Sequence, residues 1–160
     1  MIKKIFLGLS LCFLSVACNK DDETPDPGNF QTPLPEATQT GKGTFACYVD
    51  GKAYIAKKNE ITAYYQYVQG KYSFIVAGTK EERPLWNIAI GSTADALIEG
   101  NTYTLKERED GNQWGGINFT YSWDDSYDRY TNNINYKGEF TIIKLDLQKQ
   151  IISGTFWFDV

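Results

Sequence analysis

The strongest pattern after Gly43 is the alternation of large apolar residues with small polar ones. In residues 117–123 every odd position is aromatic or aliphatic, and every even position is Asn, Thr or Ser. This two-residue period places the two kinds of side chain on opposite faces of a strand that is buried on one side. No window in this region keeps a helical period beyond one or two turns. The pattern therefore predicts an all-β domain with antiparallel strands.

Short turn signals separate the other expected strands. Asp50-Gly51 and Gln69-Gly70-Lys71 each lie between two β-rich runs, and glycine accepts the positive φ that a tight hairpin turn needs. The remaining expected strands are residues 44–49, 52–57, 60–68, 72–77, 86–90, 102–106, 139–145 and 151–160. About nine or ten strands without β-α-β alternation favour an antiparallel β-sandwich, and a closed lipocalin-like β-barrel is the alternative. Residues 74–77 are apolar at every position, which indicates a central strand covered on both faces.

Residues 1–17 have the pattern of a signal peptide. Lys3 and Lys4 precede a largely apolar stretch, residues 5–13, that is too short to cross about 30 Å of hydrocarbon as a helix. The sequence Ser15-Val16-Ala17-Cys18 resembles the lipobox of bacterial lipoproteins, although Ser15 stands where a branched apolar residue is usual. The resemblance implies lipidation of Cys18. Ordinary secretory cleavage, which would leave the chain without lipid, is the alternative.

Residues 18–42 are predicted to be a disordered, acidic and proline-rich tether behind the lipidated cysteine. Four of the five prolines of the chain lie here, and no hydrophobic period survives. The run of residues 18–23, which is acidic at its last three positions, looks like the export signal of surface lipoproteins in Bacteroidota. It implies a domain, residues 43–160, that is exposed on the outer membrane, with a periplasm-facing or secreted protein as the alternatives.

Composition excludes several classes of function. The chain has no histidine, so it has no Ser-His or Cys-His nucleophile and no zinc site of the kind that contains histidine. A formal charge of −4 and a pI near 4.9 lack the basic footprint of a nucleic-acid binder. Cys12 falls in the signal peptide and Cys18 at the lipidation site, which leaves Cys47 as a buried, unreactive thiol. No cofactor is expected.

Both ends of the domain resemble one family. The opening, residues 41–52, and the closing segment, residues 152–158, are similar to an uncharacterised family of Bacteroidota outer-membrane lipoprotein domains with a GTFxCxV-(N/D)-GK start and an ISGTFxF end. The resemblance implies a compact all-β domain on a lipid tether and no established activity. The triplet Gly-Thr-Phe occurs in both segments, so the two terminal strands could lie side by side.

Trp114 is the first candidate for ligand binding. It lies in residues 110–116, a polar and glycine-rich stretch that we expect to be a loop. An indole exposed on such a loop can stack on a sugar ring, while Asn112 and Gln113 could form hydrogen bonds with hydroxyl groups. The alternative is that Trp114 folds back over the end of the core.

The segment 124–130 is the second candidate, with Tyr127 and Tyr130 as further ligand-binding residues. Asp124, Asp125 and Asp128 are weak candidates for a Ca²⁺ site, because oxygen clusters can hold this ion. They lack the spacing and the glycine of an EF-hand loop, so a solvated turn between strands is favoured. A histidine-free hydrolase that uses paired carboxylates is a less favoured alternative.

Together these features predict a lipid-anchored lipoprotein of the cell envelope that is not an enzyme. We expect it to act as a binding or accessory module, with glycans as the first class of ligand. The alternative is a structural or protein-interaction lipoprotein, such as a subunit of an envelope complex or an immunity-type protector.

Overall fold

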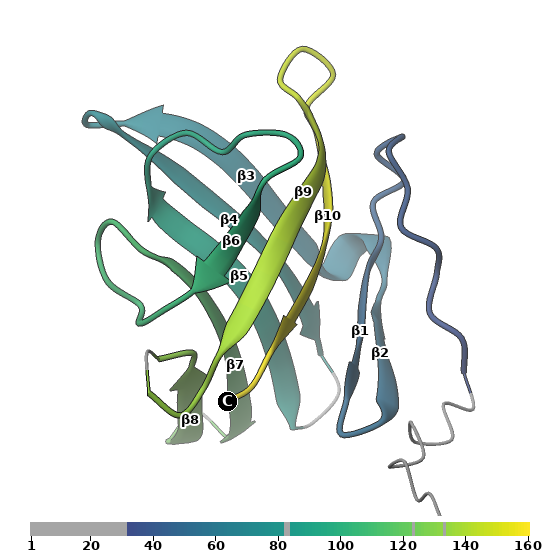
Figure 1. Cartoon of the computed structure of the whole chain (residues 1–160). Helices are drawn as coiled ribbons and strands as arrows, with labels where there is room; N and C mark the ends of the chain where they lie inside the picture. The colour runs from purple at the N-terminus through teal and green to yellow at the C-terminus, as the bar shows by residue number, and fades with distance from the viewer. Residues whose placement is uncertain (1–31, 82–83, 123, 133) are drawn as a thin grey trace, which may run out of the picture.

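The computed structural model describes residues 32–81, 84–122, 124–132 and 134–160 (Figure 1). These residues form ten strands and one short 3-10 helix, η1 (Lys58–Glu60). The strands are β1 (Phe45–Val49), β2 (Lys52–Ala56), β3 (Ile61–Val68), β4 (Lys71–Lys80), β5 (Leu85–Ala94), β6 (Thr102–Leu105), β7 (Gln113–Ser122), β8 (Asp125–Tyr130), β9 (Gly138–Asp146) and β10 (Ile151–Phe158). All strand pairs are antiparallel, which confirms the predicted all-β class. Within the described ranges, no helix has the length and the apolar character that a membrane span requires.

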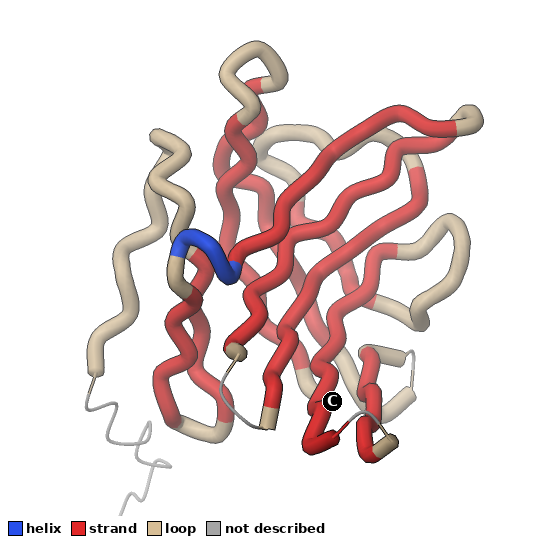
Figure 2. The backbone as a smooth tube through the Cα atoms, turned by 180° about the vertical axis from the view of Figure 1, so that it is seen from behind, coloured by secondary structure: helices blue, strands red, loops and turns tan. Residues whose placement is uncertain are grey.

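The strands form three sheets. A five-stranded sheet has the order β3-β4-β5-β7-β8, a three-stranded sheet has the order β10-β9-β6, and β1 pairs with β2 alone. The five-stranded and three-stranded sheets face each other, and the β1–β2 hairpin stands beside them (Figures 1 and 2). The architecture is the predicted antiparallel sandwich. Within the described ranges the sheets do not close into a barrel.

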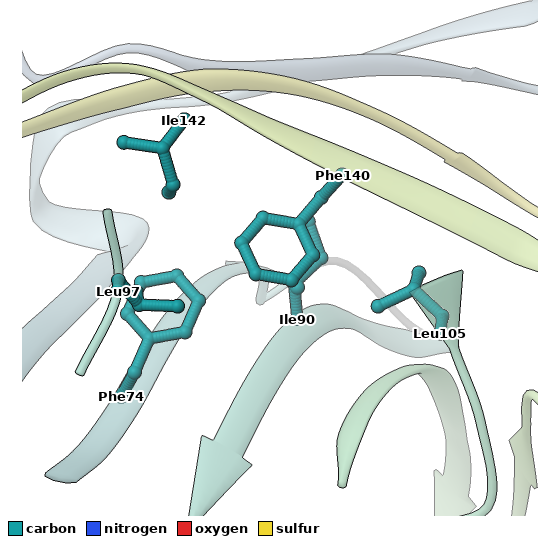
Figure 3. Close-up of a cluster of buried hydrophobic side chains, with 6 residues drawn as sticks. All are labelled: Phe74, Ile90, Leu97, Leu105, Phe140 and Ile142. Atoms are coloured by element: carbon teal, nitrogen blue, oxygen red, sulfur yellow. The ribbon is translucent and has the colours of Figure 1, made fainter. Parts of the chain in front are cut away.

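The core lies between the two larger sheets. Phe74 of β4 stacks on Phe140 of β9 with 5.7 Å between the ring centroids. Around this pair lie the other buried side chains of the cluster in Figure 3, which are Ile90, Leu97, Leu105 and Ile142. Each strand contributes alternate residues to this layer, since successive side chains point to opposite faces of a sheet. We call the face of the five-stranded sheet that carries Phe74 its inner face and the opposite face its outer face.

Two predicted hairpins are confirmed. The β1–β2 register ends at Val49 opposite Lys52, and the turn residues Asp50 and Gly51 have φ of 48° and 75°. Positive φ at both central positions is the requirement of a type I′ turn, which matches the twist of the strands. Strands β3 and β4 are joined in the same way, with Gln69 and Gly70 at φ of 50° and 86°.

The terminal strands meet through side chains rather than backbone. Phe45 of β1 stacks on Phe156 of β10 with 5.5 Å between centroids, so the phenylalanines of the two Gly-Thr-Phe triplets lie together. However, β1 pairs with β2 and β10 pairs with β9. The hairpin is therefore held on the sandwich by side-chain packing around Phe45.

Two expected loops are strands. Strand β7 begins at Gln113, so it includes Trp114, Gly115 and Gly116 of the stretch that was expected to be a loop. Residues 125–130 form β8, although they were predicted to be a turn. Both predictions failed because these residues gain a full row of ladder partners in β5 and β7, which outweighs a local preference for turns.

Candidate functional site

Two aromatic side chains lie over glycines on the outer face of the five-stranded sheet. Trp114 of β7 is opposite Gly91 of β5, and Tyr130 of β8 is opposite Gly116 of β7. A Cβ atom at Gly91 would overlap the indole of Trp114, and one at Gly116 would overlap the ring of Tyr130. The two glycines therefore leave the space in which the rings lie.

Trp114 is not the exposed residue that the sequence predicted. Only 9% of its surface is accessible, and it packs with Ala77 and Ala89 on the outer face. The alternative, an indole folded back over the end of the core, is right about burial but not about place, because the ring lies on the outer face of the sheet. The same packing explains the apolar residues on both faces of β4, since Phe74 enters the core while Ala77 lies under this second cluster.

Arg108 joins these two rings into one group, which we call the Arg108 cluster (Arg108, Trp114 and Tyr130). The carbon of its guanidinium lies 4.7 Å from the ring centroid of Trp114 and 4.8 Å from that of Tyr130. The two rings meet edge to face at 5.7 Å. Nη1 of Arg108 donates a hydrogen bond to the hydroxyl of Tyr130. The cation is thus held over two π faces and oriented by a hydrogen bond.

Burial raises the pKa of Tyr130, while the guanidinium of Arg108 opposes the shift and the carboxylate of Asp128 adds to it. The phenol therefore remains protonated at neutral pH and can both accept from Arg108 and donate a hydrogen bond. The three residues of the cluster come from the β6–β7 loop, β7 and β8. The pairing of these strands in the sheet brings them together.

A cleft of about 280 Å³ opens beside the Arg108 cluster, just below the usual volume range of ligand-binding clefts. It is lined by Arg108 and Trp114 together with Tyr64, Ser73, Thr93 and Asp110 among others. Tyr64 contributes a partly exposed ring, with 43% of its surface accessible. Nζ of Lys71 lies 3.0 Å from Oδ2 of Asp110, so this carboxylate already has a cation beside it. The cleft thus combines an aromatic wall, hydroxyl groups and a guanidinium.

The other predicted ligand-binding residues lie apart from this cleft. The side-chain amide of Asn112 donates to the carbonyl of Glu107 at 3.2 Å and so stabilises the β6–β7 loop. Gln113 pairs with Ser92 in the ladder and is half-buried. Tyr127 stacks on Phe119 at 5.1 Å, on the inner face, because it is an odd number of residues from Tyr130. Of the five predicted residues, the structure brings together Trp114 and Tyr130.

The three aspartates do not gather around one point. Oδ1 of Asp124 accepts a hydrogen bond from Ser122 at 2.5 Å, which lowers the pKa of this carboxyl. Asp128 accepts from the amide of Asn118 on the outer face. Asp124, Asp125 and Asp128 are not part of any group of three potential metal-ligating side chains within the described ranges.

Sequence reasoning missed Arg108 and also Trp157. Trp157 lies on β10 between Phe156 and Phe158, which pack into the core, so the alternation of this strand points Trp157 outward. It is 52% exposed and directly opposite Glu139. The alternation was a usable signal for Trp157. Arg108 lies among charged loop residues, and no local pattern marks it.

A larger apolar crevice of about 820 Å³ lies between β1 and β10 and reaches the core. Its lining side chains are mostly aliphatic and aromatic and include Phe45, Ile61, Ile152 and Phe156. Cys47 also lines it. Burial raises the pKa of this thiol to about 11, and the charge of Lys80 opposes the shift only partly. The other two cysteines, Cys12 and Cys18, lie outside the described residues.

We expect the stability of the protein to fall in alkali because of Cys47. The unfolded thiol ionises near its ordinary pKa of 9.0, whereas the folded one ionises at about 11. Between these values unfolding releases a proton, so the free energy of unfolding decreases as pH rises, by up to about 2–3 kcal/mol. Urea unfolding at about pH 8 and about pH 10.5 should show a larger loss for the wild type than for Cys47→Ala. Burial also raises the pKa of Tyr54, but this residue is present in both proteins, so its contribution is common to the two losses. Equal losses in the two proteins would therefore contradict the assignment to Cys47.

Comparison of the chain with models of known protein families, with curated proteins and with solved structures finds no match. The similarity of the two ends of the domain to Bacteroidota lipoprotein domains therefore stays a prediction.

Proposed function

We propose that this protein is a lipid-anchored binding module of the cell envelope that captures glycans and performs no catalysis. The observation that carries the proposal is the cleft beside the Arg108 cluster, where planar groups and hydrogen-bonding groups line one concave surface. In this proposal the signal peptide directs export, and the lipid on Cys18 holds the domain at the outer-membrane surface. Mass spectrometry of the purified protein tests the anchor, and an unmodified N-terminal cysteine would rule it out.

The arrangement of the chain is compatible with this role. The segment that precedes β1, residues 32–43, runs along the β1–β2 hairpin at one side of the sandwich (Figures 1 and 2). The β6–β7 loop, which carries Arg108, lies at the opposite side (Figure 1). A tether that continues from residue 32 would therefore leave the cleft accessible.

The lining of the cleft matches the chemistry of sugars. A pyranose ring offers an apolar face that stacks on an aromatic ring and hydroxyl groups at its edge. Tyr64 can supply the stacking surface, while Ser73, Thr93 and Asp110 supply groups that accept or donate hydrogen bonds. Trp114 is too buried to stack on a sugar, so its part is to hold Arg108 and to form the floor of the cleft.

Glycan binding by the full-length protein in detergent tests the proposal. We expect a glycan array to identify a ligand, and Tyr64→Ala to weaken its binding by about ten-fold, as expected for the loss of one stacking contact. Tyr67→Ala is the matched control, because Tyr67 lies three residues along the same strand, on the inner face, and is more exposed. Absence of any glycan ligand, or equal effects of the two substitutions, would refute the proposal.

A protein-interaction role is the second candidate, and the exposed end of β3 favours it. Strand β3 is an edge of the five-stranded sheet, and Tyr64, Tyr67 and Val68 on it are all exposed. Edge strands with exposed apolar residues can pair with another chain. Crosslinking in intact cells distinguishes the two roles, because one stoichiometric protein partner would support this candidate.

A further inference from the structure

Arg108 is oriented before any ligand binds. Trp114 and Tyr130 each lie within 5 Å of the guanidinium carbon, and the Tyr130 hydroxyl accepts one of its hydrogen bonds. The rings themselves are held over Gly91 and Gly116 in the sheet. A guanidinium has five N–H donors in a planar fork, so most of its donors remain for another partner.

The charges around the cleft leave Arg108 without an anionic partner. Asp110 is paired with Lys71 at 3.0 Å, and no carboxylate of the part of the chain that the structure describes lies within ion-pair distance of Arg108. Glu109 also lines the cleft and carries the opposite sign. An anionic group would therefore be attracted to the guanidinium of Arg108 and repelled by the carboxylates of Glu109 in the cleft and Asp128 beside Tyr130, which restricts how the ligand can lie.

We propose that the ligand of this cleft is an anionic glycan whose carboxylate or sulfate pairs with the guanidinium of Arg108. The inference rests on the proposed function and names its ligand class. The planar guanidinium can form two parallel hydrogen bonds with such a group, and its contacts with the Trp114 and Tyr130 rings hold it in place for them. Serine and threonine hydroxyls of the cleft then face the uncharged part of the sugar.

Two matched pairs of polysaccharides test this proposal with the full-length protein. Polygalacturonate is compared with its methyl ester, and dextran sulfate is compared with dextran, so each pair differs only in the anionic group. We expect the charged member of one or both pairs to bind at least about ten-fold more tightly, since a hydrogen bond to a charged group contributes about 1.5–3 kcal/mol. Binding should weaken at about 0.5 M salt, because salt screens exposed charges. The pair that discriminates identifies carboxylate or sulfate as the source of the charge.

Arg108→Gln should abolish the preference for the charged member, with a loss of about ten-fold or more in its affinity. Arg108→Lys keeps the charge but not the planar fork, so it should retain only part of the preference. Arg129→Gln is the control, because Arg129 has the same charge and is exposed but lies over Tyr127. Thermal melts should show that all three variants remain folded, because both arginines are exposed.

The outcomes separate the two proposals. Equal binding of the charged and uncharged members, with Tyr64→Ala still harmful, would overturn the anionic ligand but leave glycan binding in place. Equal losses in Arg108→Gln and Arg129→Gln would also overturn it, because they would indicate general attraction between charges. Binding of none of the four polysaccharides would overturn the anionic ligand, and a glycan array without any ligand would overturn the proposed function as well.

Discussion

Replacing Phe45 with alanine is expected to lower the free energy of unfolding by about 3–5 kcal/mol, the usual cost of removing a buried phenylalanine. Phe45 is 4% exposed and stacks on Phe156 of β10 at 5.5 Å. It also meets Tyr54 edge to face, and a Cβ atom at Gly78 would lie 2.6 Å from its ring. Because the β1–β2 hairpin forms a sheet of its own, this one side chain connects it to both larger sheets.

Urea unfolding measures this effect, with Phe45→Leu as the control. Leucine keeps most of the apolar volume, so it should cost less than about 2 kcal/mol. Hydrogen exchange gives a second readout, since amides of β1 and β2 should lose protection before those of β4 and β5 if the hairpin detaches as a unit. A loss below about 1 kcal/mol in Phe45→Ala would show that other contacts hold the hairpin.

Substitution of Gly91 by valine should destabilise the protein by about 3 kcal/mol and disrupt the Arg108 cluster, because overpacking and loss of indole burial act together. A side chain at this position occupies the space of the Trp114 indole. The indole must then leave Ala77 and Ala89, and Arg108 loses one of its two rings. The affinity for the glycan ligand should fall together with the stability. The fluorescence emission maximum of Trp114 should shift to longer wavelength.

A double-mutant cycle isolates the cause of this effect. In a Trp114→Ala background the valine at position 91 has space, so Gly91→Val should be neutral there or stabilise the strand. Gly91→Ala provides a graded step, because its single methyl group already overlaps the indole. If Gly91→Val costs the same free energy in both backgrounds, the steric explanation is wrong.

The fold was largely predictable because its main signals are local. The period of two in 117–123 and the glycines of the two hairpins act over a few residues, and the structure has a strand over 117–122 and turns at the two hairpins. The exceptions were β8 and the beginning of β7, whose residues favour turns and loops. Their partners in the ladder, such as Gln113 with Ser92, are distant in the chain, so no window around either residue contains that information.

The candidate site was predictable only in part for the same reason. Trp114 and Tyr130 were chosen for their chemistry, and the sheet brings them within 5.7 Å of each other. Tyr127 was chosen on the same grounds but faces the other way, which the odd separation from Tyr130 could have shown once a strand was assumed. Arg108 has no local signal, because its two ring partners and the cleft exist only in the folded sheet.

Periodicity and turn chemistry in the chain were therefore enough to specify an antiparallel β-domain, its hairpins and the two faces of its clearest strand. They act between neighbours, where backbone geometry and side-chain alternation are set by adjacent residues. The order of the strands, the burial of Trp114 over Gly91 and the placing of Arg108 over two rings arose only when distant segments packed. These features depend on which surfaces meet and on the space that small residues leave there, and that information is spread over the whole domain.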